Sequence, residues 1–221
     1  MKLEKQTRWY DDACGTAHAL ELLGERWSLL VVRELMFGAR RFSDLRRGLP
    51  GISANVLTQR LGALEAAGVL RRRTLPPPAG VQVYELTPWG YETEPFVQSL
   101  GRWAARSPGH DPTLPLSAAS LMMSFRTMFA RGAGPGLRIG FRLGPDAFVA
   151  QAADGALAIG RGEPDGADAV VTAAPKAVAA LVYGGAPLAE LEKAGAVAVE
   201  GDRAALARFA SLFTLPPKAG A

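Results

Sequence analysis

The chain has 221 residues, of which 48% are apolar and 21% charged, and its formal net charge is +4. This length favours two domains, and the composition is that of a folded globular protein rather than a disordered chain. No apolar run reaches the roughly 18 residues needed to cross a bilayer, and residues 1–10 lack the apolar core of a signal peptide. We therefore expect a cytoplasmic protein without a membrane partner.

The positive charge is concentrated in the N-terminal half. Residues 1–110 carry 15 Lys and Arg against 11 Asp and Glu, whereas residues 111–221 carry 10 of each. Eight arginines lie between residues 40 and 73, where Asp44 and Glu65 are the acids: Arg40, Arg41, Arg46, Arg47, Arg60, Arg71, Arg72 and Arg73. Such a local excess attracts polyanions such as DNA, although a solvated surface is the alternative.

Residues 13–66 have the apolar spacing of several short helices. Residues 13–37 predict two short helices, or one bent at Gly24. A helix of barely two turns follows, with Ser43 as its N-cap and a stop at Pro50. Ser53 is the expected N-cap of the next helix, which ends before Gly68. This last helix buries Leu57, Leu61 and Leu64 on one face and presents Asn55, Thr58, Gln59 and Gly62 on the other.

The pattern changes to a period of two after Gly68. The stretch reads VLRRRTLPPPAGVQVYELT, and the residues from Pro76 to Gly80 suit a turn, so we expect a β-hairpin. Thr87 followed by Pro88 resembles an N-cap with a first-turn proline, and it predicts a long helix through Phe96, Leu100 and Trp103.

The second half predicts an α+β domain after a linker rich in Pro and Gly. We place an N-terminal domain at residues 1–107, the linker at 108–115 and the second domain at 116–221. The second domain begins with a helix. Four strands follow in GLRIGFRLG, AFVAQAADG, ALAIGRG and ADAVVTAAP, then helices in PKAVAALVYGG and PLAELEKAG, a strand in AVAVEG and a helix in DRAALARFASLF.

Two short helices joined by a Pro-Gly turn and followed by a basic hairpin form a winged helix-turn-helix. A helix enters the major groove when its outer face is slim and polar, which is the pattern of Ser53, Asn55, Thr58 and Gln59. We expect these four side chains to contact base edges. The eight arginines between residues 40 and 73 are the expected phosphate contacts.

The segments CGTAHALELLGERWSLLVVREL, RRFSDLRRGLPGISANVLTQRLGALEAAGVLRR and YELTPWGY resemble the HxlR-type winged-helix transcriptional regulators, relatives of the MarR group. The resemblance covers residues 12–106. It implies a homodimer, paired through N- and C-terminal helices, that binds a pseudo-palindromic double-stranded DNA operator. Residues 53–60 would be the recognition segment and residues 74–81 the wing tip. Because this tip carries no charge, we assign phosphate contact to Arg71, Arg72 and Arg73 instead.

Residues 116–213 resemble the sterol carrier protein type-2-like fold. This resemblance implies a five-stranded sheet covered by helices, with an apolar cavity for a lipid-like effector. The side chains that would line the cavity are Met122, Met123, Met128, Phe129, Phe141, Phe148 and Phe209. Apolar spacing alone does not distinguish such a cavity from a packed core.

The single cysteine, Cys14, excludes an intrachain disulfide. Some HxlR-type regulators sense oxidants or electrophiles with an N-terminal cysteine, so Cys14 is a candidate redox sensor, with an incidental thiol as the alternative. Cys14 and His18 share a helical face, but two ligands do not complete a metal site. No phosphate-binding loop, nucleophile motif or catalytic His/Asp constellation occurs, so we expect neither an enzyme nor a cofactor.

The sequence therefore predicts a homodimeric DNA-binding transcriptional regulator whose C-terminal domain binds an apolar effector. The alternative is a lipid or small-molecule carrier that uses its N-terminal half only for dimerisation.

Overall fold

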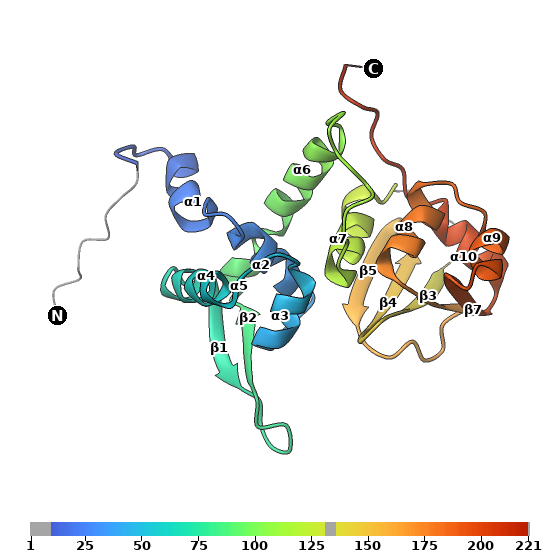
Figure 1. The fold of residues 1–221 in the computed structure, drawn as a ribbon, viewed down its shortest axis with the longest axis horizontal. Helices are drawn as coiled ribbons and strands as arrows, with labels where there is room; N and C mark the ends of the chain where they lie inside the picture. The colour runs from blue at the N-terminus through green and yellow to red at the C-terminus, as the bar shows by residue number, and fades with distance from the viewer. Residues whose placement is uncertain (1–9, 131–135, 221) are drawn as a thin grey trace. The chain divides into compact units, whose positions relative to one another are not determined.

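The computed structural model describes residues 10–130 and 136–220, which form two compact units divided between Thr93 and Glu94 (Figure 1). This division precedes helix α6 (Glu94–Ala105), whereas the sequence placed the boundary after it, at residue 107. The reason is that α6 packs against α7 (Ala118–Met128) of the second unit. Arg126 pairs with Glu94 there, and Arg102 donates to the carbonyl of Thr127.

The first unit combines short helices with one hairpin. Its elements are α1 (Gly15–Leu23), α2 (Ser28–Leu35), α3 (Phe42–Gly48), α4 (Ala54–Ala66), β1 (Leu70–Thr74), β2 (Gln82–Leu86) and α5 (Pro88–Tyr91). Residues 13–37 were predicted to form either two short helices or one bent helix, and two separate helices is correct. Trp27, between α1 and α2, has a φ of 82°, which is not a helical conformation. No helix in the described ranges is long and apolar enough to span a bilayer.

The core of the first unit lies between α2, α3 and α4. Leu57, Leu61 and Leu64 on α4 are at most 2% exposed, as the sequence predicted. They are joined in the core by Leu35 of α2 and Leu45 of α3, both fully buried. Because α4 buries one leucine face in this way, its other face is left to solvent.

Two of the predicted N-caps are confirmed and one is wrong. Ser53 accepts a hydrogen bond from the Val56 amide at 3.2 Å, and Thr87 accepts one from the Gly90 amide at 3.0 Å. Ser43 is not a cap, because α3 begins one residue before it, at Phe42.

The single long helix expected after Thr87 is instead two helices, α5 and α6. The buried Thr93 hydroxyl donates to the Gly90 carbonyl at 2.7 Å and closes a turn at the break. Gly90 lies directly against the Val69 carbonyl, where a Cβ atom would be 2.0 Å from that oxygen. This close approach holds α5 against the chain that enters β1.

The hairpin of β1 and β2 extends beyond the helices of its unit (Figure 1). The strands are antiparallel, and Arg71 is opposite Glu85 while Arg72 is opposite Tyr84. Val83 and Leu86 face the core. Arg40 and Tyr84 exchange two backbone hydrogen bonds of 2.8 Å, which add a third short chain segment to the hairpin.

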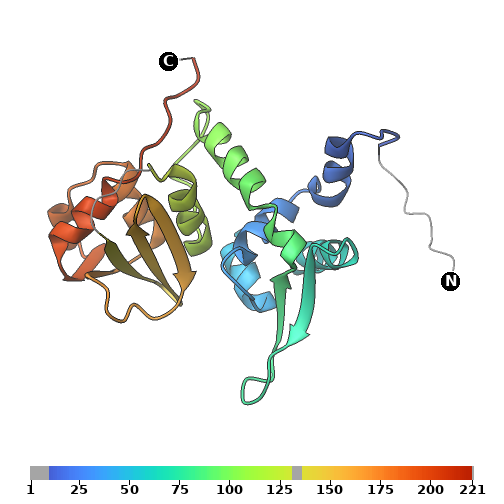
Figure 2. The same cartoon turned by 180° about the vertical axis from the view of Figure 1, so that it is seen from behind.

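The second unit confirms the predicted five-stranded sheet with helices. After α6 and α7 it contains β3 (Leu137–Leu143), β4 (Asp146–Ala153), β5 (Ala156–Arg161), β6 (Ala169–Ala173), α8 (Pro175–Tyr183), α9 (Leu188–Lys193), β7 (Val197–Gly201) and α10 (Arg203–Ala210). The strand order is β5-β4-β3-β6-β7, in which β3 and β6 are parallel and the other pairs antiparallel. Figure 2 shows this sheet from the side opposite to Figure 1.

Candidate nucleic-acid interface

The outward face of α4 carries the polar side chains that were predicted to contact bases. Ser53, Asn55, Thr58 and Gln59 are all exposed. The amides of Asn55 and Gln59 each offer donors and an acceptor, which is the combination that reads an adenine edge. Ser53 uses its oxygen as the N-cap, and the Thr58 hydroxyl donates to the Ala54 carbonyl at 2.9 Å. Asn55 and Gln59 therefore keep the larger hydrogen-bonding capacity.

A hollow of about 450 Å³ lies on α3, the helix before α4. Phe42, Ser43, Arg46 and Arg47 line it. Arg47 pairs with Asp44 at 2.7 Å, whereas within residues 10–130 and 136–220 neither Arg46 nor Arg41 forms an ion pair. Arg41 and Arg46 are both exposed. They bring uncompensated positive charge to this side of the unit, which suits a phosphate group.

The three consecutive arginines of β1 are held in ion pairs on opposite faces of the hairpin. Arg71 and Arg73 both bind the Glu85 carboxylate, with nitrogen–oxygen distances of 2.7 and 2.8 Å. Arg72 faces the other way and binds Glu65 of α4 at 2.9 Å. This alternation follows from the two-residue period of a strand. The charge of the run is therefore partly neutralised within the protein.

These ion pairs shift the pKa values of two of the residues that form them, Glu85 and Arg72. Partial burial opposes ionisation of Glu85, but the hydrogen bonds from Arg73 and Arg71, together with their charges, outweigh it and lower the pKa of this carboxyl. The hydrogen bond and charge of Glu65 raise the pKa of Arg72. The ion pairs thus favour the charged forms of Glu85 and Arg72.

Two of the predicted phosphate contacts have structural roles inside the unit. Arg60 is 19% exposed and pairs with Glu25 at 2.8 Å. This ion pair links α4 to the segment between α1 and α2. Arg40 is half-buried, and its backbone pairs with Tyr84. Their assignment to phosphates stays a prediction, and their burial makes the exposed arginines better candidates.

Comparison with known proteins matches this half of the chain to transcriptional regulators. Residues 22–111 fit the family model described as HxlR-like helix-turn-helix. The HTH-type transcriptional regulator YvaP of Bacillus subtilis is 36% identical over 86 residues, which are 39% of this chain and 80% of that protein. The chain belongs to the HxlR-like helix-turn-helix family.

Other HTH-type transcriptional regulators give similar values. YtfH of Escherichia coli is 35% identical over 99 residues, covering 45% of this chain and 79% of YtfH. YodB of B. subtilis is 35% identical over 86 residues, covering 39% of this chain and 77% of YodB. The solved reduced form of YodB aligns with 45% of this chain and 100% of its own, at 31% identity and a TM-score of 0.40. The relatives are named as HTH-type transcriptional regulators, and this HxlR-type chain is accordingly a DNA-binding regulator.

Cys14 occupies the N-cap position of α1 in this HxlR-like chain, and its thiol is exposed. Hydrogen bonds from the backbone of Thr16 and Ala17 and from the Thr16 side chain lower the pKa of the thiol. His18 pairs with Glu21 at 3.1 Å. In the part of the chain that the structure describes, no three His, Cys, Asp or Glu side chains gather as a metal site would require.

The residues proposed to line a cavity lie in the interior of the second unit. Met122, Met123, Met128, Phe141, Phe148 and Phe209 are buried, and Phe129 is half-buried. The ring centroids of Phe141 and Phe209 are 5.8 Å apart, and Phe125 is 5.8 Å from each of them. Rings at these separations are in mutual contact, as in a packed core.

Reasoning from the sequence missed the acidic partners of the arginines. Glu25, Glu65 and Glu85 come from a loop, a helix and a strand, and only the folded chain brings them to Arg60, Arg72 and Arg71. One of these pairs had a usable signal. In the antiparallel register of the hairpin, Glu85 is directly opposite Arg71.

Proposed function

We propose that this protein regulates transcription by binding a pseudo-palindromic operator as a homodimer, with α4 of each copy in the major groove. The observation that carries the proposal is the exposed polar face of α4, together with the exposed Arg46 of α3 and Arg41 at its N-cap, which form no ion pair within the described residues. The polar side chains would read base edges, and the arginines would hold the helix in register on the phosphates.

The DNA-binding proposal is tested by measuring the affinity for duplex DNA at increasing salt. Binding should weaken steeply with salt, because phosphate contacts release counterions. Asn55→Ala and Gln59→Ala should change the preferred sequence in a binding selection, while Arg46→Ala should weaken binding to all sequences. Affinity that is independent of salt and sequence would instead favour the alternative, a carrier whose N-terminal half only dimerises it.

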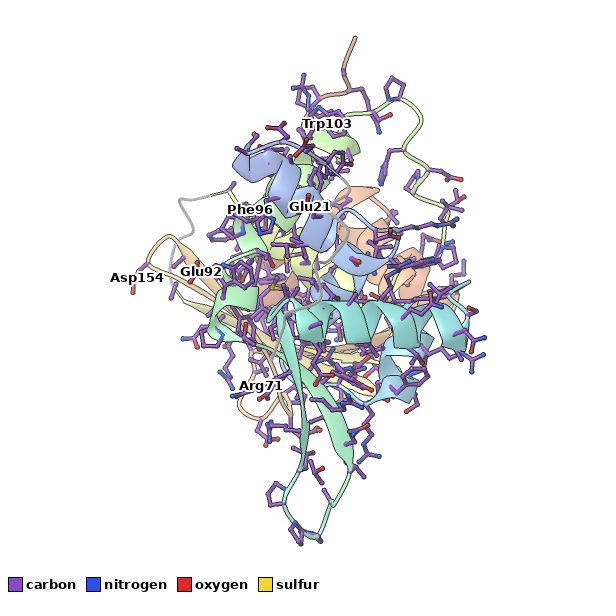
Figure 3. All side chains as sticks on the ribbon, turned by 90° about the vertical axis from the view of Figure 1, so that its left-hand side faces the viewer. Glu21, Arg71, Glu92, Phe96, Trp103 and Asp154 are labelled. Atoms are coloured by element: carbon purple, nitrogen blue, oxygen red, sulfur yellow. The ribbon has the colours of Figure 1, made fainter. Side chains whose placement is uncertain are left out.

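Dimerisation is supported by exposed apolar side chains on two helices. Phe96, Leu100 and Trp103 follow the helical period on α6 and are 58%, 47% and 74% exposed, and Leu20 on α1 is 47% exposed. Figure 3 labels Phe96 and Trp103 along α6. Light scattering should give twice the monomer mass of 23.3 kDa, and Trp103→Glu should reduce it. A monomeric mass for the unmodified chain at micromolar concentration would contradict a dimer.

We also propose that the second unit has a sterol carrier-like fold and binds an apolar effector. The support is its five-stranded sheet and the Met- and Phe-rich interior. Because the described rings contact one another, a ligand would have to separate them. Saturable binding of a fluorescent fatty-acid analogue, with a change in operator affinity, is the expected result. Absence of binding up to the solubility limit of the probe would contradict this part.

A response to oxidants through Cys14 is a further element of the proposed regulation. Its exposure and lowered pKa support it, because the thiolate is the reactive form. Operator binding by Cys14→Ser should no longer respond to an oxidant such as diamide. An unchanged response in that variant would remove the thiol from the mechanism.

A further inference from the structure

The carboxylate of Glu85 on β2 forms ion pairs with two arginines of β1. The Nε and Nη2 atoms of Arg71 lie 2.7 Å from Glu85 Oε1, and Arg73 Nε lies 2.8 Å from Glu85 Oε2. Both oxygens of Glu85 are therefore engaged by guanidinium groups. The arrangement follows from the fold, since Arg71 and Arg73 lie on the same face of β1 and Glu85 lies opposite Arg71 on β2.

The exposure of these side chains is unequal. The Arg71 and Arg73 side chains are 63% and 43% exposed, whereas Glu85 is only 13% exposed. Figure 3 shows Arg71 at the side of the hairpin. A phosphate that approached this face would meet the guanidinium groups first, with the carboxylate covered behind them.

The three side chains together carry a net charge of +1 rather than +2. A DNA phosphate that binds either arginine would have to share or replace a charge-assisted hydrogen bond of 2.7 to 2.8 Å that already exists. Because the carboxylate and the phosphate offer similar acceptors, the exchange yields little free energy. Arg41 and Arg46, which form no ion pair within the described residues, bind a phosphate without such an exchange.

We propose that Glu85 is a specificity-determining residue for DNA binding, which lowers the affinity for arbitrary duplex DNA by occupying Arg71 and Arg73. Sequence-independent affinity comes from phosphate contacts, and selectivity is the difference between this affinity and that for the operator. Because Glu85 neutralises part of the positive charge of the β1–β2 hairpin, a larger share of the discrimination between sequences comes from the side chains of α4. This inference rests on the proposed DNA-binding function and adds the residue that limits its non-specific part.

The test compares full-length Glu85→Gln with the unmodified protein on a fluorescent duplex of random sequence, by anisotropy at several KCl concentrations. We expect Glu85→Gln to bind about tenfold more tightly at low salt. The slope of log affinity against log salt should become steeper by about 0.9 for each additional phosphate that the variant neutralises. In a background of Arg71→Ala with Arg73→Ala, the same Glu85→Gln change should raise the affinity less than it does in the unmodified protein, because the two arginines that Glu85 occupies are gone.

A matched control is Glu200→Gln in the second unit, which removes one acid that pairs with Arg142 at 3.4 Å. It makes the same change in net charge and should leave the binding of random duplex within about twofold if the effect of Glu85 is local. An equal increase in affinity in the control, or no increase in Glu85→Gln, would overturn the inference.

A second comparison does not depend on the folding of Glu85→Gln. Because Glu85 offsets one of the two arginine charges, replacing Arg71, Arg73 and Glu85 together by alanine removes a net charge of +1, as Arg46→Ala does. Since Glu85 occupies both arginines whereas Arg46 forms no ion pair within the described residues, this triple variant should lose less affinity for random duplex than Arg46→Ala. A larger loss from the triple variant would overturn the inference while leaving DNA binding intact. Failure of the unmodified protein to bind duplex in a salt-dependent way would instead overturn the proposed function itself.

Discussion

Arg126 of α7 and Glu94 of α6 form a two-point ion pair, in which the Arg126 Nη1 atom lies 2.9 and 3.0 Å from the two carboxylate oxygens. The Nη2 atom of the same guanidinium donates to the Ile159 carbonyl on β5 at 2.6 Å. One side chain thus joins two helices and the sheet of the second unit. This explains why α6 belongs to that unit although the family match continues to residue 111.

The first prediction concerns this junction. Arg126→Met should destabilise the second unit by about 1–3 kcal/mol, because it leaves a half-buried carboxylate and a carbonyl without their donor. The measurement is urea unfolding followed by circular dichroism. Arg142→Met is the control, since its pair with Glu200 is exposed and should contribute less than about 1 kcal/mol. Equal stability of the two variants would show that Arg126 does not hold α6 in place.

The second prediction compares two arginines of the candidate interface. Arg46→Ala should weaken binding to random duplex more than Arg72→Ala, because Arg72 is already paired with Glu65 while Arg46 is not paired within the described residues. Losing one phosphate contact should reduce the salt slope by about 0.9. Anisotropy titrations at three salt concentrations measure both quantities. A larger loss for Arg72→Ala would mean that its ion pair opens at little cost.

Local patterns in the sequence predicted most of the elements, and the exceptions have identifiable causes. The leucine spacing of α4 and the period-two pattern of the strands each reflect a single buried face, which the sequence records directly. The break between α5 and α6 could not be read in the same way. It depends on Gly90 lying against the Val69 carbonyl, a contact between positions 21 residues apart.

The candidate site was predictable in its polar face and not in its electrostatics. Asn55 and Gln59 are exposed because Leu57 and Leu61 on the same helix are buried, and this relation is periodic. The effective charge of Arg60 or Arg71 depends on Glu25 or Glu85, which reach them only through tertiary structure. A count of arginines therefore overstates the charge that is available to a ligand.

The third prediction concerns the reactivity of Cys14. Amide donors from Thr16 and Ala17 at the N-terminus of α1, together with the Thr16 side chain, lower the pKa of the thiol, so more thiolate is present at neutral pH than in a free cysteine. The rate of alkylation by iodoacetamide, measured against pH, should have its midpoint below that of an unstructured cysteine peptide. The peptide is the control for intrinsic reactivity. A midpoint equal to that of the peptide would contradict stabilisation of the thiolate by the helix.

The fourth prediction concerns Tyr183 in the interior of the second unit, which lies beside the Phe125 ring and whose hydroxyl is 3.0 Å from Ser124 Oγ. Burial raises the pKa of Tyr183 strongly, and the hydrogen bond with Ser124 opposes this only in part. The folded state therefore keeps the phenol neutral, while in the unfolded chain it ionises near pH 10, as an approximate reference value. Since the folded-state pKa is the higher one, this contribution to stability is complete below about pH 10 and is lost as the pH rises beyond it.

Unfolding by urea between pH 8 and 11 should accordingly show a decrease in stability that is smaller in Tyr183→Phe, which has no phenol to ionise. Tyr91→Phe is the matched control, because Tyr91 lies on α5 in the first unit and is 39% exposed. Its decrease should equal that of the unmodified chain. If Tyr183→Phe and Tyr91→Phe lose stability alike, the Tyr183 hydroxyl ionises as readily in the folded unit as in water, and the packing around Phe125 admits solvent.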